Sequence, residues 1–137
     1  MARHDDPELQ RVVESAITEA KVESAVIFAR RPGSSELELA AAAGIDGPPL
    51  ERLVEAVRNP AHPISRTVVD QIAGFDVHPT TPGGPALRSH LPFGHDGSRS
   101  TATGVLAVAH DQMLDANARR VLVRLADAAG ELLTRAG

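Results

Sequence analysis

Arg88 and His90 are the residues whose types and spacing best fit ligand-binding chemistry. They alternate with Leu87, Ser89 and Leu91 within positions 86–93, so a strand there turns both side chains to one face of a sheet. Arginine binds a carboxylate or phosphate through two parallel hydrogen bonds, and histidine adds a donor that titrates near neutral pH. The same pattern also fits a solvated strand edge or an internal salt bridge to an Asp or Glu.

Three further residues could border a binding site. His62 and Arg66 lie four residues apart and share a face if their segment is helical. A surface helix with two exposed basic residues explains the same spacing, because Arg and His are usually accessible to solvent. Phe75 stands beside Gly74 and close to a loop rich in Pro and Gly, so we expect its ring to line a cavity.

The sequence offers little support for metal or catalytic chemistry. Cysteine is absent, and the six histidines form no H-x-H or H-x-x-x-H pair beside an acidic cluster. No G-x-S-x-G motif or phosphate-binding loop is present either. We therefore expect no metal site, no cofactor and no enzymatic activity. Haem ligation by a single His is left open.

Length and composition favour one globular domain spanning residues 1–137. Apolar residues make up 42% of the chain and aromatic residues 2%, and the net charge is −4. Few aromatic rings and a negative charge argue against binding to nucleic acid. The polar start from Met1 to Leu9 shows no signal peptide, and no membrane helix is visible, so we expect a cytoplasmic protein. Frequent Arg and Ala are typical of bacterial coding sequences with high GC content.

Periodicity predicts the elements that would position these residues. A first helix is predicted over 7–20, and a last helix begins after Asp115 as N-cap. Asp5 or Asp6 is the expected N-cap of the first helix. Strands are predicted at 24–29, 36–40, 75–77, 86–93 and 104–109, and short helices begin near Pro48 and Pro63.

The two terminal helices carry apolar stripes wide enough for two contacts, one with the sheet and one with a partner chain. We expect a homodimer whose interface is a helical bundle across a two-fold axis. Its expected residues are Leu9, Val13, Ile17, Leu125 and Leu132.

Four local patterns, in the same order along the chain, resemble those of GAF domains. They are residues 38–45, where small residues lead to Gly44, residues 62–68, the Arg88-Ser89 pair followed by Pro92, and residues 104–107. The resemblance implies an α+β fold, GAF/profilin-like, with a mainly antiparallel central sheet of five to six strands. The N- and C-terminal helices would cover one face of this sheet, and the short middle helices the other.

The resemblance also implies a function. GAF domains act as sensory or regulatory modules, so we expect a small molecule to bind between the sheet and the middle helices. The protein would act in signal transduction or transcriptional regulation through a partner. The middle helix that begins near Pro63 borders the pocket in GAF domains, which makes His62 and Arg66 further candidate ligand contacts.

Departures from the family pattern reduce the number of GAF-domain functions that this chain could have. Without Cys the chain cannot attach a bilin or follow the GAF-fold methionine sulfoxide reductases, and the Asn-Lys-Phe-Asp-Glu set of cyclic-nucleotide-binding members has no counterpart. The stretch from Gln71 to Pro85 is shorter than the pocket-covering segments of many members. The alternative is therefore a homodimerising interaction module with a vestigial pocket and no ligand.

Overall fold

The computed structural model describes residues 7–30, 36–78, 86–95 and 102–136. The expected N-cap at Asp5 or Asp6 lies outside these residues. The elements run in the order α1 (Pro7–Ala20), β1 (Ser24–Arg30), β2 (Leu37–Ala43), α2 (Gly47–Ala56), α3 (Pro63–Asp70), β3 (Gly74–Val77), β4 (Leu87–His95), β5 (Ala102–His110) and α4 (Ala116–Ala136). Each predicted helix and strand is confirmed, with shifts of a few residues at the ends.

The sheet has five strands within the described residues, in the order β2-β1-β5-β4-β3. All neighbouring strands pair antiparallel. The central strand β5 pairs with β1 and β4, and continuous apolar runs in β1 and β5 suit strands that are covered on both faces. The prediction of an α+β fold with a mainly antiparallel sheet is confirmed.

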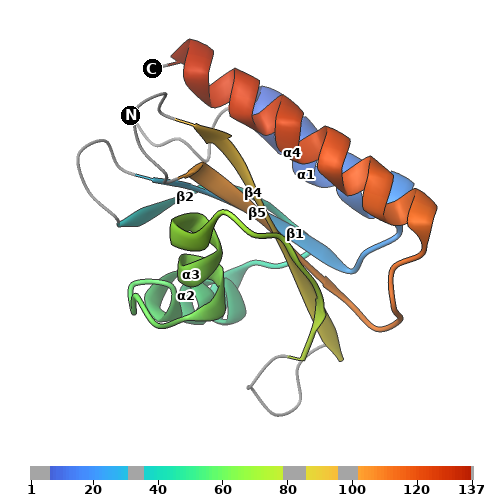
Figure 1. Ribbon diagram of the computed structural model, residues 1–137. Helices are drawn as coiled ribbons and strands as arrows, with labels where there is room; N and C mark the ends of the chain where they lie inside the picture. The colour runs from blue at the N-terminus through green and yellow to red at the C-terminus, as the bar shows by residue number, and fades with distance from the viewer. Residues whose placement is uncertain (1–6, 31–35, 79–85, 96–101, 137) are drawn as a thin grey trace.

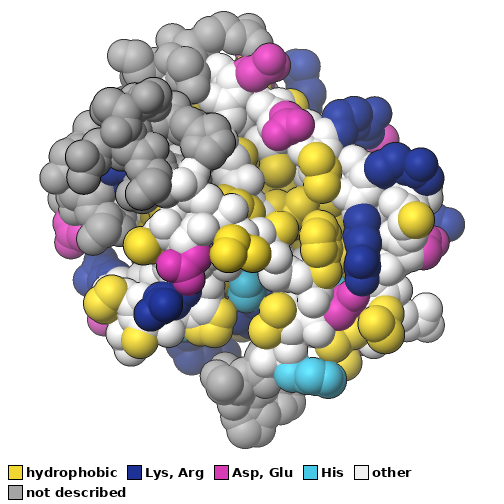
Figure 2. All heavy atoms as spheres, in the orientation of Figure 1, with side chains coloured by type: hydrophobic (Ala, Val, Ile, Leu, Met, Phe, Trp, Pro, Cys, Tyr) yellow, Lys and Arg dark blue, Asp and Glu magenta, His cyan; other side chains and the backbone are white. Residues whose placement is uncertain are grey.

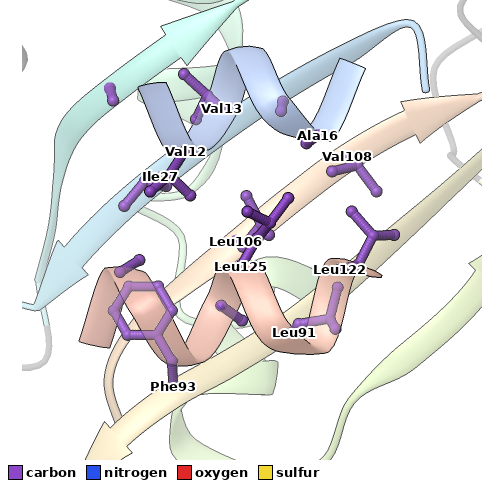
Figure 3. Close-up of a cluster of buried hydrophobic side chains, with 14 of the residues drawn as sticks. Val12, Val13, Ala16, Ile27, Leu91, Phe93, Leu106, Val108, Leu122 and Leu125 are labelled. Carbon is purple, nitrogen blue, oxygen red and sulfur yellow. The ribbon is translucent and has the colours of Figure 1, made fainter. Parts of the chain in front are cut away.

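Two layers of helix enclose the sheet (Figure 1). Helices α1 and α4 lie side by side on one face, which we call the α1/α4 face, and α2 and α3 cover the opposite α2/α3 face. Figure 3 shows the core of the α1/α4 face, built from Val12, Val13, Ala16, Ile27, Leu91, Phe93, Leu106, Val108, Leu122 and Leu125. A smaller cluster that includes Val26, Phe28, Ile64 and Val68 fills the α2/α3 face. The predicted arrangement of the helices is therefore confirmed.

The residues that we expected at a dimer interface belong to this internal core. Leu9, Val13 and Leu125 are 1%, 0% and 7% exposed, and Ile17 and Leu132 are partly buried against the same cluster. The physical reason is that α1 and α4 turn their apolar stripes to each other and to the sheet within one chain. Leu9, Val13 and Leu125 are therefore covered within one chain in this arrangement, and the expected homodimer stays a prediction.

Two glycines allow the sheet to pack closely. A Cβ at Gly104 would lie 2.5 Å from Phe93 Cζ and 2.6 Å from the Phe28 carbonyl oxygen. Gly44 has a φ of +77°, and a Cβ there would lie 2.3 Å from the Glu23 carbonyl oxygen. Gly104 thus lets the Phe93 ring lie against β5, and Gly44 lets the chain leave β2 beside the start of β1.

Candidate functional site

A cavity of about 220 Å³ lies between the sheet and α2. Ser24, Val26, Ala107 and Ala109 line it on β1 and β5, and Leu53 lines it on α2. Small side chains at three of these four positions leave the space that larger residues would fill. Arg88 supplies a cation to the lining, and Gly44, Ile45 and Glu23 stand at the end where β2 leaves the sheet.

Arg88 reaches this cavity because of the alternation along β4. Leu91 and Phe93 point into the core of the α1/α4 face, so Arg88 and His90 point to the opposite face. Arg88 is partly buried, and burial lowers the pKa of its guanidinium. Among the described residues, no carboxylate forms a salt bridge with it. The salt-bridge interpretation of Arg88 therefore finds no support in this part of the chain.

His90 and His62 lie within electrostatic reach of Arg88. His90 is 2% exposed, and burial, together with the charges of Arg88 and His62, lowers its pKa to about 4. Its Nε2 is buried without a hydrogen-bond partner among the described residues. His62 caps α3 by accepting a hydrogen bond at Nδ1 from the Ile64 amide over 3.1 Å, and burial and then Arg88 lower its pKa. The structure thus brings three of the five predicted ligand-binding residues together.

Arg66 and Phe75 do not join this group. Arg66 has 62% of its side chain exposed and pairs with Asp70 on the outer surface of α3 over 3.5 Å. Phe75 packs against the core of the α1/α4 face, with the Arg119 guanidinium 4.9 Å from the centre of its ring. Our expectation that Phe75 lines the ligand cavity is not met, because the irregular register of β3 turns its ring toward α4.

Sequence reasoning missed a polar network behind the cavity. The Asp76 amide donates to Ser89 Oγ over 3.0 Å, and Ser89 Oγ lies 2.9 Å from His110 Nε2. His110 Nδ1 lies 2.7 Å from the Gln112 carbonyl, which can only accept, so the ring proton is on Nδ1. The Ser89 hydroxyl, which accepts from the Asp76 amide, can then donate its own proton to Nε2. The signal in the sequence was Ser89 itself, a hydroxyl on the apolar side of its strand, where it needs a buried partner.

A second cavity of about 360 Å³ lies at the end of the sheet, where α1 leads into β1 and β5 leads into α4. Lys21, Glu23, Asp111 and Asp115 are among its lining residues. A hydrogen bond with Asp111 is the main cause of a raised Glu23 pKa, although the Glu23 side chain is exposed. Within the described ranges, no three His, Asp or Glu side chains gather closely enough to hold a metal ion. None of the helices in those ranges is long and apolar enough to span a bilayer.

No protein-family model matches the sequence, and no curated protein matches it either. Solved structures do match. The GAF domain of an Acinetobacter phosphoenolpyruvate-protein phosphotransferase aligns with a TM-score of 0.71 and 18% identity, over 99% of this chain and 84% of its own. The second GAF domain of DevS from Mycobacterium smegmatis aligns with a TM-score of 0.67 and 18% identity, over 96% and 95% of the two chains. This chain has the GAF fold.

A third match shows how widely the GAF fold is used. Residues 122 to 287 of a methyl-accepting chemotaxis protein align with a TM-score of 0.64 and 19% identity, over 93% of this chain and 87% of that one. All three matches have identities under 20%, so the likeness extends to the fold alone. The function has to be argued from the side chains of this chain's own GAF fold.

Proposed function

We propose that this protein is a sensory or regulatory module that binds a small anionic molecule in the cavity between the sheet and α2. It passes the bound state to a signalling partner and performs no catalysis itself. The observation that carries the proposal is Arg88, a partly buried cation in the cavity wall with no carboxylate partner among the described residues. The match to a chemotaxis protein supports the signalling context.

Electrostatics favour an anion over other ligands. A guanidinium keeps its positive charge at neutral pH even when burial lowers its pKa, so Arg88 bears a desolvation cost. A carboxylate or phosphate would offset this cost through two charge-assisted hydrogen bonds. A cationic ligand would instead meet the field of Arg88, which already disfavours protonation of both His62 and His90.

The volume of the cavity limits the size of this ligand. Sites for drug-sized molecules usually occupy roughly 300 to 1,000 Å³, and this cavity has about 220 Å³. A small carboxylic acid or a compact phosphate ester fits it better than a nucleotide. Apolar atoms of the ligand would lie against Val26, Leu53 and Ala107.

The test begins with native mass spectrometry of protein purified from its own host, where a discrete extra mass would identify a bound molecule. Thermal-shift measurements with phosphate and a panel of small carboxylates then compare the wild type with Arg88→Ala. Arg66→Ala is the matched control, because Arg66 lies exposed on α3. We expect one of the anions to raise the melting temperature of the wild type and of Arg66→Ala but not of Arg88→Ala.

Two results would contradict the proposal. One is bare protein whose melting temperature no anion raises, and the other is equal stabilisation of Arg88→Ala and the wild type. The same mass spectra report the oligomeric state. A dimer would have to form through surfaces other than Leu9, Val13 and Leu125, because these are buried within one chain.

A further inference from the structure

The edge strand β3 lies against the polar residues of the candidate site. Its two paired positions are Gly74 opposite His90 and Val77 opposite Arg88. These partners on β4 are the residues that face the cavity side of the sheet. Any movement of β3 away from β4 would therefore occur directly beside Arg88 and His90.

Between these paired positions the strand leaves its register. Asp76 has a φ of +57°, a left-handed conformation that is uncommon outside Gly, and the register shifts between Gly74 and Val77. Such a conformation persists only where surrounding contacts hold it. The bulge turns the side chains of Phe75 and Asp76 toward the start of α4.

The contacts that hold the bulge come from the segment where α4 begins. Asp76 Oδ1 accepts a hydrogen bond from the Leu114 amide over 3.0 Å, and Asp76 Oδ2 pairs with Arg119 Nη2 over 2.7 Å. Only 8% of the Asp76 side chain is exposed, and the guanidinium of Arg119 also lies over the Phe75 ring. We call the contacts of Asp76 with Leu114 and Arg119 the Asp76 junction.

The electrostatics of Asp76 agree with this geometry. Burial of the carboxyl group opposes its ionisation, but the hydrogen bonds from Leu114 and Arg119 and the charge of Arg119 outweigh burial and lower its pKa. The ionised carboxylate is therefore the form that holds the junction at neutral pH. Figure 2 shows basic side chains gathered along α4 on this side of the molecule, with apolar side chains exposed between α4 and the middle helices.

The backbone of the bulge is also hydrogen-bonded to the sheet. The amide of Asp76 donates to Ser89 Oγ, and Ser89 in turn contacts His110 at the end of β5. His110 Nδ1 donates to the carbonyl of Gln112, two residues before Leu114. Asp76 thus links β3 to β4 on one side and to the start of α4 on the other.

We propose that the Asp76 junction is a conformational latch, so that β3 leaves the Arg88–His90 edge and the first turn of α4 loosens in one event. A change at the cavity edge would then alter α4, and a change imposed on α4 would alter the edge by the same free energy. This coupling does not depend on a ligand and stands apart from the proposed anion binding.

Hydrogen-exchange mass spectrometry of the full chain tests the latch without any ligand. Asp76→Asn removes the charge but keeps an oxygen for the Leu114 amide. We expect amide exchange to accelerate in both residues 74–77 and residues 112–119, by roughly ten- to a hundredfold, the range for losing a charged hydrogen bond. Asp70→Asn is the control, because it breaks only the exposed pair with Arg66 and should leave both segments at wild-type rates.

Arg119→Gln removes the partner of Asp76 on α4. This variant tests the latch independently if Asp76→Asn fails to fold. Arg119 has 44% of its side chain exposed, so its replacement leaves the core intact. The latch predicts faster exchange in residues 74–77 as well as in α4. Acceleration confined to residues 112–119, with wild-type exchange in β3, would overturn the proposal.

Discussion

The two faces of the sheet differ in how fully their helices bury apolar side chains. On the α1/α4 face, α1 alone buries Leu9, Val12, Val13, Ala16 and Ala20 against the strands and α4. On the α2/α3 face, α2 buries no residue fully, and a cavity remains between Leu53 and the small residues of β1 and β5. The partly buried Arg88 and the buried His90 lie on this second face.

The difference indicates that the α1/α4 face mainly stabilises the fold and that the α2/α3 face is suited to binding. Close apolar packing stabilises the fold, because each buried side chain gains contacts and loses water. The buried His90 imidazole, whose Nε2 has no hydrogen-bond partner among the described residues, reduces stability and is tolerated where it serves another purpose. We therefore expect substitutions on the α1/α4 face to affect stability most and substitutions on the α2/α3 face to affect binding most.

The largest expected effect comes from truncating the centre of the α1/α4 face. Leu106 is fully buried in its core, so Leu106→Ala should lower the free energy of unfolding by about 4 kcal/mol. Leu53→Ala on the other face should cost about 1 kcal/mol or less, because Leu53 is partly buried beside an existing cavity. Urea unfolding of both variants measures the difference. Equal losses would remove the distinction between the faces.

His90 gives the α2/α3 face a pH dependence in the range where histidine titrates. Its folded-state pKa of about 4 lies below the ordinary 6.5, so the unfolded chain takes up the proton first as the pH falls. Stability is therefore complete above about pH 6.5 and declines toward about pH 4, by about 3 kcal/mol in total. Urea unfolding across this range should show the decline in the wild type.

The variant His90→Gln isolates this contribution because glutamine does not titrate. Its unfolding free energy should depend less on pH over the same window. The lowered pKa of His62 acts in the same direction and leaves a smaller slope in the variant. An unchanged slope in His90→Gln would show that other groups cause the pH dependence.

Local patterns in the sequence predicted much of this architecture. The 3.6-residue period of apolar side chains placed the first helix at 7–20, and Asp115 was correctly assigned as the N-cap of the last helix. Alternation along β4 placed Arg88 and His90 on one face. Helix bounds, caps and the faces of a strand depend on residues close together in the sequence, so they can be predicted from one sequence.

The errors concern contacts between distant segments. An apolar helix face predicts that something covers it, but Leu125 could be covered by α1 of the same chain or by a partner, and the sequence did not distinguish them. Phe75 was misplaced because the bulge at Asp76 breaks the alternation of β3. A positive φ at Asp76 depends on Leu114 and Arg119, which lie about forty residues away.

A smaller loss of unfolding free energy than for Leu106→Ala is expected at two buried serines. Ser89 lies on β4 on the α1/α4 side, and Ser65 lies on α3 on the other side. Ser89→Ala removes the partner of both the Asp76 amide and His110 Nε2, so it should cost about 2 kcal/mol. Ser65→Ala removes one bond to the Val57 carbonyl and should cost about 1 kcal/mol. Thermal or urea unfolding of the two variants compares them. A larger loss for Ser65→Ala would indicate that α3 contributes more to stability than its contacts suggest.

The smallest expected effect compares the caps of one helix from each face. Asp115 Oδ1 accepts a hydrogen bond from the Ala118 amide over 2.7 Å, so Asp115→Ala should cost about 1 kcal/mol. Asp46 stands at the same position before α2, but its side chain makes no capping hydrogen bond. Asp46→Ala should therefore change the unfolding free energy by only about 0.5 kcal/mol or less. Comparable losses in urea unfolding would mean that α2 is held as firmly as α4, and the cavity beneath it would then lie under a rigid helix.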